Sequence, residues 1–411
     1  MKKSKLGEVL SISSMSVIPQ AGITYKLYSL PSFDDGQEPE TAGSETIQSN
    51  KYVVPTRCIL FNKLNVRFKR IWRINNNIPN KLCSTEFLPL VINEDLIDYQ
   101  YCYYLLASDY LTNYLCGINS NTSGSHKRIN PDILLSVDVA LPTLNEQKRI
   151  GSMLANLDRK IEINRAINHN LEAIAKQLYD YWFVQFDFPN TEGKPYKSSG
   201  GKMVWNEKLK REIPEEWHCG NLFEIATFTN GLACQKFRPK DGEVPLPVIK
   251  IREMHDGISS DTEEVSPNIP ESVKVYNGDV LFSWSASLEV ILWACGLGGL
   301  NQHIFKVTSA NDFPKSFYYF QLLNYVDVFK KMAEARKTTM GHITQDHLQQ
   351  STIAIPDNKD IVDKFEKRIS PIFAQMVKLQ EEIQQLSKQR DELLPLLMNG
   401  QASLNYDLAH D

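Results

Sequence analysis

Two long apolar stripes restrict what this chain can fold into more than any other feature. The first lies between Leu141 and Phe188, and its apolar residues recur in alternating steps of three and four at Ile150, Leu154, Leu157, Ile161, Leu171, Ile174 and Leu178. The second is interrupted only by Arg390 and comprises Val362, Phe365, Ile369, Ile372, Met376, Leu379, Ile383, Leu386, Leu393 and Leu397. This spacing is typical of coiled-coil helices. Since a helix with one apolar face needs a partner to cover it, the two helices most simply pack against each other.

Polar residues and a proline fall within these stripes. Asn164 and Asn168 lie on or beside the first seam, where buried amides fix register at a cost in stability, although simple exposure of both amides fits the sequence equally well. Pro371 follows Ser370, a pair that starts helices, so we expect a kink or a restart there. Roughly 36 residues at about 1.5 Å each would make the second helix a rod of about 54 Å.

The composition is that of an ordinary soluble globular protein. A chain of 411 residues suggests two to four domains, and 42% hydrophobic and 23% charged residues are usual values. No apolar run approaches the ~18 residues of a membrane span, and the basic N-terminus has no apolar core behind it, so we expect neither a membrane anchor nor a secretory signal. Seven cysteines are scattered singly, which predicts reduced thiols and a cytoplasmic location.

The net charge of −4 does not by itself indicate a nucleic-acid-binding protein. Any such face must be formed by local clusters of basic residues. These clusters are Lys63, Arg67, Lys69, Arg70 and Arg73; Lys127 and Arg128; Lys236, Arg238 and Lys240; Lys250 and Arg252; and Lys330, Lys331, Arg336 and Lys337. A single cluster is more often a solvated surface than a phosphate site, but clusters at matching places in two domains carry more information.

The chain also repeats itself with a period of roughly 215 to 220 residues. The matching segments are residues 5–12 with 221–228, residues 58–62 with 279–283, and residues 126–129 with 340–343. After the second of these matches, each repeat reaches a tryptophan, Trp72 or Trp293, at the same distance. Each repeat then ends in a strand closed by Pro142 or Pro356, directly before one of the long helices. The predicted order is domain, helix, domain, helix.

Within each repeat we expect the same elements in the same order. Residues 52–61 and 274–284 are predicted strands, and residues 96–115 and 315–332 are predicted helices with one buried face. A polar loop follows each helix, at residues 119–127 and 335–342. Both loops combine small hydroxyl residues, glycine and basic side chains, which allow a backbone to approach phosphates while a few side chains reach base edges.

The joint between the first helix and the second repeat is the most specific part of the sequence. It reads LPTLNEQKRI at 141–150, YDYWFVQFDFPNTEGKPYKSSGGKMV at 179–204 and REIPEEWHCGNLFEI at 211–225. Over nearly its whole length the chain resembles the specificity (S) subunits of type I restriction–modification enzymes. The residues that carry the resemblance are Pro142, Glu146, Gln147, Trp182, Phe183, Phe186, Gly193, Tyr196, Ile213, Pro214 and Trp217. The second repeat departs from this pattern, because Pro356 is followed by DNKDIVDKF without the Glu-Gln pair.

The resemblance, together with the repeat, implies an α+β fold. It consists of two similar mixed α/β target recognition domains separated by two long antiparallel coiled-coil helices, with pseudo-twofold symmetry. The expected segments are a first target recognition domain at 1–142, a central spacer helix with an aromatic end at 143–188, a linker at 189–210, a second target recognition domain at 211–356, and a C-terminal spacer helix and tail at 357–411.

The resemblance further implies a non-catalytic, DNA-binding subunit. It would recognise a bipartite, asymmetric target in double-stranded DNA, with one half-site per domain and the helices setting the spacer. Two methyltransferase (M) subunits and the restriction (R) subunits would bind it, and adenine methylation in each half-site would be the reaction. S-adenosylmethionine, ATP and Mg²⁺ would be bound by those partners, and this chain would carry no cofactor.

The expected contact residues fall into two sets. The DNA-binding set contains Lys63, Arg67, Ser123, His126, Lys127 and Arg128 in the first domain and Arg238, Arg252, Ser283, Ser285, Arg336, Thr338, Thr339 and His342 in the second. The subunit-interface set contains Glu146, Gln147, Tyr181, Trp182, Phe183 and Phe186. A core-packing role fits the four aromatic residues equally well.

Two other classes of function remain possible from the sequence alone. The chain has no phosphate-binding GxxxxGK loop, no HExxH and no Asn/Asp-Pro-Pro-aromatic methyltransferase motif. A stand-alone DNA methyltransferase or nuclease with an unrecognised site is nevertheless one alternative, and turnover by the purified chain would favour it. A coiled-coil scaffold without a DNA role is the other, and sequence-specific DNA retardation would exclude it.

Overall fold

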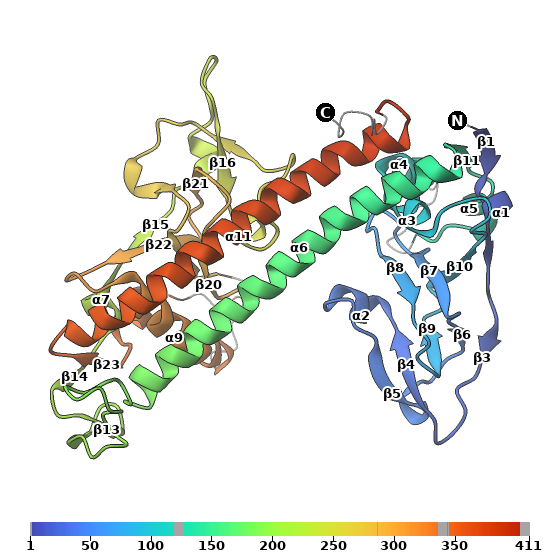
Figure 1. The fold of residues 1–411 in the computed structure, drawn as a ribbon. Coiled ribbons are helices and arrows are strands. Elements are labelled where there is room, and N and C mark those ends of the chain that lie inside the picture. The colour runs from blue at the N-terminus through green and yellow to red at the C-terminus, as the bar shows by residue number, and fades with distance from the viewer. Residues whose placement is uncertain (1, 119–126, 286, 336–342, 344, 403–411) are drawn as a thin grey trace, which may run out of the picture. The chain divides into compact units, whose positions relative to one another are not determined.

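The fold is described from a computed structural model covering residues 2–118, 127–285, 287–335, 343 and 345–402 (Figure 1). The chain divides into two compact units. Unit 1 contains Met1–Lys160 and Leu386–Asp411, and unit 2 contains Ile161–Gln385. Each unit contains one end of both long helices, α6 (Leu144–Tyr179) and α11 (Asp360–Met398).

Unit 1 is a mixed α/β unit with two main sheets. Its helices are α1 (Leu6–Val9), α2 (Leu30–Asp34), α3 (Tyr99–Ala107), α4 (Asp109–Ile118) and α5 (Pro131–Leu135). Its strands are β1 (Lys2–Lys5), β2 (Leu10–Ile12), β3 (Ser16–Val17), β4 (Thr24–Tyr28), β5 (Glu40–Gly43), β6 (Lys51–Val53), β7 (Arg57–Asn62), β8 (Ile71–Asn75), β9 (Lys81–Cys83), β10 (Phe87–Ile92) and β11 (Asp138–Leu141). The sheets have the orders β2-β10-β7-β8 and β3-β6-β9-β4-β5, and β1 pairs with β11.

Unit 2 has the same kinds of elements. Its helices are α7 (Leu222–Ile225), α8 (Ile251–Asp256), α9 (Lys315–Ala335) and α10 (Gln345–Gln349), and a π-helical turn, η3 (Asp180–Val184), follows α6. Two 3₁₀ turns, η4 (Cys234–Lys236) and η5 (Glu271–Val273), complete the helical part. The strands are β12 (Met203–Asn206), β13 (Arg211–Pro214), β14 (Trp217–Gly220), β15 (Ala226–Asn230), β16 (Leu246–Ile249), β17 (Glu264–Val265), β18 (Lys274–Val275), β19 (Val280–Ser283), β20 (Glu289–Leu292), β21 (Gly298–Leu300), β22 (Ile304–Ser309) and β23 (Ile353–Pro356).

The strand orders of the two units confirm the internal repeat. The sheet β2-β10-β7-β8 of unit 1 corresponds to β15-β22-β19-β20 of unit 2. The order β6-β9-β4-β5 corresponds to β18-β21-β16-β17, and in each case the central pair, β9 with β4 or β21 with β16, is parallel. The outer pair β1–β11 corresponds to β14–β23, both antiparallel. Unit 1 adds one short edge strand, β3.

Three of the predicted elements are divided in the structure. The strand expected at 52–61 is two strands, β6 and β7, which belong to different sheets, and Pro55 lies between them. Proline has no N–H for a sheet ladder, so it suits the crossing from one sheet to the next. The strand expected at 274–284 is divided in the same way into β18 and β19 by a turn at Gly278, whose φ is +86°. The helix expected at 96–115 is α3 and α4, separated at Ser108.

The two long helices pair antiparallel within each unit. In unit 1, Asp158 of α6 meets Arg390 of α11, with Oδ1 and Nη1 2.9 Å apart. In unit 2, Asn164 is buried and its Nδ2 donates to Glu382 Oε2 at 2.9 Å, so the register-fixing role expected of this amide fits the contact. Asn168 is half-buried, and its Oδ1 has no hydrogen-bond partner among the described residues.

Two details of the helices differ from expectation. Helix α11 runs without interruption through Pro371, so the restart expected there is absent. Ile174 is 55% exposed, and the adjacent Ala175 takes its place in the core. The α-helix has 3.6 residues per turn against 3.5 in a heptad, so an apolar stripe drifts around the helix as it proceeds.

Candidate DNA interface

The loop between β7 and β8, residues 63–70, lies beside the segment that follows α4. Ile129 N donates to Lys63 O at 3.0 Å, and Asn65 N donates to Lys127 O at 2.8 Å. These bonds bring two basic clusters that the sequence keeps about 60 residues apart onto one surface: Lys63 and Arg67 from the loop, Lys127 and Arg128 from the returning chain. A third segment, at Glu86 just before β10, joins them, because Lys63 N donates to Glu86 O at 2.9 Å. We call these three chain segments together the unit 1 junction.

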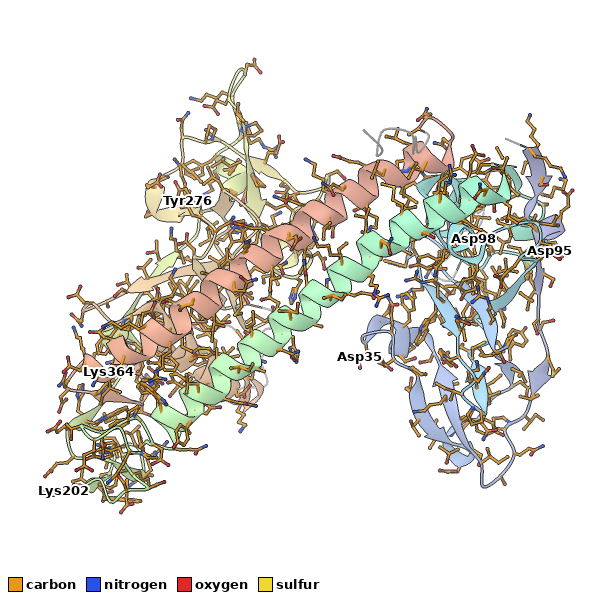
Figure 2. All side chains as sticks on the ribbon, viewed as in Figure 1. Asp35, Asp95, Asp98, Lys202, Tyr276 and Lys364 are labelled. Atoms are coloured by element: carbon orange, nitrogen blue, oxygen red, sulfur yellow. The ribbon has the colours of Figure 1, made fainter. Side chains whose placement is uncertain are left out.

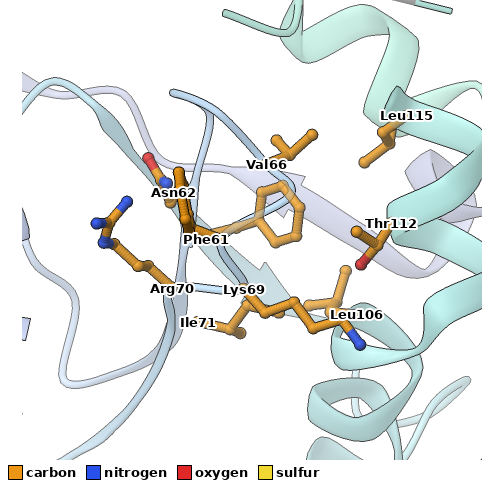
Figure 3. A pocket seen from close by; sticks show the side chains of 10 residues that line it. Phe61, Asn62, Val66, Lys69, Arg70, Ile71, Leu106, Thr112 and Leu115 are labelled. Atoms are coloured by element: carbon orange, nitrogen blue, oxygen red, sulfur yellow. The ribbon is translucent and has the colours of Figure 1, made fainter. Parts of the chain in front are cut away.

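Carboxylates already hold several cations of this surface. Arg128 makes a bidentate pair with Glu86, with Nη2–Oε1 2.7 Å and Nε–Oε2 2.9 Å, and this pairing raises the pKa of the arginine. Arg70 pairs in the same way with Asp34, and Lys69 with Asp109. Figure 3 shows Lys69 and Arg70 extending in opposite directions beside a small hollow of unit 1. A phosphate would therefore have to compete with internal carboxylates for these cations.

Unit 2 builds the same junction from the equivalent backbone positions. Ile343 N donates to Trp284 O at 3.0 Å, and Trp284 N donates to His303 O at 3.3 Å. The sequence repeat aligns Ser283 with Asn62 and Ile343 with Ile129, so Trp284 occupies the position of Lys63. We call Trp284, His303 and the chain at Ile343 the unit 2 junction.

The residue before each junction position has a structural role. Asn62 is buried, donates from Nδ2 to Leu64 O and accepts from Leu64 N. Ser283 is fully buried, donates to Ser287 O and accepts from Glu289 N at 3.1 Å. Ser285 is buried as well. Because Ser283 and Ser285 are buried, they shape the hairpin of β19 and β20 and do not reach its surface as predicted DNA contacts would.

The remaining predicted DNA contacts lie elsewhere or outside the described residues. Arg238 is exposed in the segment between η4 and β16. Arg252 is exposed in α8, where Glu253 and the carbonyl of Asp261 hold its guanidinium. The predicted contacts Ser123, His126, Arg336, Thr338, Thr339 and His342 fall outside the part of the chain that the structure describes.

Glu146 and Gln147, expected at a subunit interface, act within unit 1. Glu146 Oε2 accepts from the N and Oγ1 of Thr143 at 2.9 and 2.8 Å, which caps α6; the Thr143 hydrogen bonds lower the pKa of this carboxyl. Gln147 is 1% exposed and accepts from Asp98 N at 2.8 Å while donating to Pro142 O at 3.0 Å. Asp98, labelled in Figure 2, is the N-cap residue of α3, so Gln147 links the start of α6 to the start of α3. The interface role expected for Gln147 is wrong because its amide is buried and occupied.

Three of the four aromatic residues expected at the interface belong to the core of unit 2. Trp182, Phe183 and Phe186 are 2%, 3% and 0% exposed. The ring of Phe183 lies 5.0 Å from that of Phe365, and the ring of Phe186 lies 5.2 Å from that of Trp217. Of the two roles that the sequence left open, core packing is therefore the correct one for these three residues, while Tyr181 is 38% exposed.

Exposed apolar residues occur instead on the side of α6. Ile163, Ile167 and Ile174 are 47%, 41% and 55% exposed. At about 100° per residue they lie within about 40° of one another around the helix axis. The sequence pattern did not identify this isoleucine stripe: it assigned Ile174 to the coiled-coil seam and passed over Ile163 and Ile167, which lie beside that seam.

The described part of the chain has neither a membrane-spanning helix nor a cluster of metal ligands. None of the helices in this part of the chain is long and apolar enough to cross a bilayer. The described side chains form no group of three or more His, Cys, Asp and Glu residues that could hold a metal ion.

The profile of the type I restriction modification DNA specificity domain matches the chain twice, at residues 1–173 and 214–389. The MjaIX specificity subunit of Methanocaldococcus jannaschii is 24% identical over 78% of this chain and 73% of its own length. The HindI specificity subunit of Haemophilus influenzae is 22% identical over 84% of this chain and 86% of its own. A crystal structure of the S subunit of a type I restriction–modification system from M. genitalium has a similar fold, with a TM-score of 0.57 and 13% identity over 98% of this chain and 96% of that one.

The chain belongs to the type I restriction–modification specificity family, since the family profile covers most of its length. Its function is DNA-target specificity, and specificity subunits are the non-catalytic members of these systems.

Proposed function

We propose that the two units each read one half of a bipartite, asymmetric target in double-stranded DNA. The observation that carries the proposal is the junction built twice on one backbone pattern but with different side chains, Lys63 in one unit and Trp284 in the other. Two readers with one frame and different surfaces suit two different half-sites. Base-edge contacts would specify the sequence, while basic residues such as Arg67 and Lys127 would hold phosphates.

The two long helices would set the spacer between the half-sites. Helix α6 has 36 residues and α11 has 39, which at about 1.5 Å per residue gives about 54 and 58 Å. Against about 34–36 Å per turn of DNA, such lengths suit half-sites about one and a half turns apart. Deleting a matched heptad from both helices should shorten the unread spacer by about three base pairs and leave both half-sites unchanged. A change in the half-sites themselves would contradict this role.

The proposed partners are two methyltransferase subunits and the restriction subunits, which would bind S-adenosylmethionine, ATP and Mg²⁺. The helix pair remains the proposed docking surface, now with the isoleucine stripe of α6 as its apolar part in place of the buried aromatic residues. We place the assembly in the cytoplasm, where its DNA target is accessible.

Copurification tests the docking surface. Changing Ile163 and Ile167 to Asp should abolish copurification of the methyltransferase subunit, because it places two charges in an apolar contact. Arg165→Glu, a change at an exposed residue on the opposite side of α6, is the control and should leave copurification intact. Equal losses with both variants would remove the stripe from the proposal.

Mapping of methylated adenines tests the function as a whole. The chain should be expressed with its methyltransferase subunit and the methylated sites of a plasmid library sequenced. A bipartite motif with two different halves is expected, and a continuous or symmetric motif would overturn the proposal. Purified chain alone, given S-adenosylmethionine and Mg²⁺, should neither methylate nor cut DNA.

A further inference from the structure

Trp284 is the first residue after β19 and is only half-buried. Its indole ring lies 6.0 Å from the ring of the buried Phe305 and 5.5 Å from the ring of the exposed His303. Its Nε1 donates to Oδ1 of the exposed Asn230 at 3.2 Å. The three side chains come from three different segments, the ends of β15 and β19 and the start of β22, so the sheet itself brings them together.

In the internal repeat, this cluster lies at the position equivalent to the unit 1 junction. Trp284 and His303 stand where unit 1 has Lys63 and Glu86, as the two pairs of equivalent backbone hydrogen bonds show. In unit 1 that place belongs to the surface on which the basic loop and the returning chain meet. A half-buried tryptophan flanked by an exposed imidazole and an exposed amide is therefore the unit 2 counterpart of a predicted DNA-contacting surface.

The hydrogen bond between Trp284 and Asn230 fixes what the amide can offer. An indole N–H can only donate, so the atom facing it must be Oδ1, and the NH₂ group of Asn230 points elsewhere as a donor. A donor amide beside a flat apolar ring matches base edges in the major groove that present acceptors, such as guanine O6 and N7 or thymine O4, with the thymine methyl available to the ring. The buried Phe305 ring contacts the indole at a tilt of 35° and supports it from the core side.

We propose that Trp284, Asn230 and His303 form a specificity-determining cluster that reads base edges of the half-site assigned to unit 2. This inference rests on the proposed function and deepens it by naming residues that the sequence pattern did not select. The cluster would discriminate among base pairs at one or two adjacent positions of that half-site, and it would have no influence on the other half-site.

The test uses the complex of the full chain with its methyltransferase subunit on a random-sequence plasmid library, with methylated adenines mapped by sequencing. Asn230→Ala and His303→Ala should each relax discrimination at one or two positions of one half-site by roughly tenfold, with the other half-site and the spacer unchanged. Trp284→Ala should affect the same positions more strongly. Trp205→Ala, which removes a tryptophan that is 58% exposed on β12, is the control and should leave the whole motif unchanged.

Two results would overturn the inference. One is a wild-type motif from both Asn230→Ala and His303→Ala. The other is a relaxed motif in both half-sites with Asn230→Ala or His303→Ala, since the cluster would then not read one half-site alone. A wild-type complex without a bipartite motif would instead contradict the proposed function itself, so the two failures are distinguishable.

Discussion

The two units share a frame and differ in what they display on it. The backbone bonds of the two junctions are equivalent, and the isoleucine that anchors each one, Ile129 or Ile343, is buried. The side chains at the surface differ in kind: unit 1 presents lysine, arginine and glutamate, and unit 2 presents tryptophan, histidine and asparagine. The comparison shows that the backbone bonds and the buried isoleucine of the junction are kept in both units, while the exposed side chains differ.

The units also hold the ends of α6 by different physical means. Unit 1 uses polar groups. The Gln147 amide binds at the start of the helix. Further along, Asp158 accepts from Tyr104 Oη at 2.5 Å and from Arg390 Nη1 at 2.9 Å. Unit 2 uses an aromatic cluster, in which the Tyr179 ring lies 5.1 Å from Phe183 and 5.3 Å from Phe320. Polar bonds specify orientation, whereas aromatic rings contribute buried area.

The largest expected effect comes from the aromatic attachment. Phe183→Ala should lower the free energy of unfolding by about 3–5 kcal/mol, because it leaves a cavity among packed rings. Urea unfolding followed by tryptophan fluorescence measures this, and the signal reports mainly on unit 2 because Trp72 is the only tryptophan before residue 161. The half-exposed Tyr181, changed to Ala, should cost less than about 1 kcal/mol. Similar losses for both variants would contradict the aromatic attachment.

The polar attachment of unit 1 should be weaker but more specific. Asp158→Ala should cost about 2–3 kcal/mol, because it removes the acceptor of two hydrogen bonds at a side chain that is only 14% exposed. Asp391→Ala removes the other carboxylate beside Arg390, but this one is 64% exposed, so less than about 0.5 kcal/mol is expected. Equal effects in urea unfolding would show that burial of the pair does not matter.

Alkaline pH gives the same attachment a second test. Burial, and then the hydrogen bond to Asp158, raises the pKa of Tyr104. The protonated phenol is therefore favoured in the folded state, and its contribution to stability is complete below the ordinary tyrosine pKa of about 10 and is lost as pH rises beyond it. Unfolding free energies measured from pH 8 upward should fall more steeply for wild type than for Asp158→Ala.

The charged junction of unit 1 predicts a moderate effect on DNA binding. Glu86→Gln should release Arg128 for phosphate, tighten binding several-fold and increase the salt dependence by about one phosphate contact. Glu94→Gln makes the same charge change beside Arg57, at the other end of β7, and serves as the control. Fluorescence anisotropy at several salt concentrations, on the assembled complex, separates the two variants. Identical salt slopes would show that Arg128 does not contact phosphate.

The smallest effect distinguishes the two outer strand pairs, β1–β11 in unit 1 and β14–β23 in unit 2. In unit 2, His218 of β14 lies between Asp357, with Nδ1–Oδ1 2.5 Å, and Glu224, with Nε2–Oε2 3.3 Å. Burial alone would lower the pKa of His218, but the hydrogen bonds to these two carboxylates outweigh it and raise the pKa. The charged imidazole therefore contributes stability that is complete below about pH 6.5 and is lost as pH rises through the raised value.

The advantage of wild type over His218→Gln should accordingly be below about 1 kcal/mol at pH 5.5, since the ring is half-exposed, and should vanish by pH 9. In the corresponding strand pair of unit 1, Lys5 Nζ lies 3.8 Å from Asp138 Oδ1, and neither strand contains a histidine. Lys5→Gln should leave the difference from wild type constant between pH 5.5 and 9, and a pH-dependent difference there would contradict the contrast.

The apolar periodicity of the sequence was sufficient to predict the long helices, and aligning the sequence with itself was sufficient to predict the repeat. Leu154, Ile161, Phe365 and Ile369 are buried as their spacing predicts. The division of β6 from β7 was not predicted, because a run of apolar residues through Pro55 does not reveal that it changes sheets. Aligning Asn62 with Ser283 already placed Trp284 opposite Lys63, but a search for basic clusters passes over an aromatic residue.

The candidate site was predicted in part. The proximity of Lys63 and Lys127 depends on backbone bonds between segments far apart in sequence, which no local pattern encodes. Ser283, Gln147 and Trp182 were selected for their chemistry or motif, and neither property reveals that a side chain points into the core. Exposure of Ile163 and Ile167 depends on which side of α6 faces its neighbours, and this is settled only by packing.

The outer strand pairs have a consequence for inheritance. Because β1 lies against β11 and β14 against β23, the chain enters and leaves each recognition domain at neighbouring points, just ahead of a long helix. A gene segment coding for residues 6–137 or 221–352 could thus be replaced in frame by another of different length and sequence while the sequences of both long helices stay unchanged. New target preferences could then arise by a single recombination event in place of many point changes.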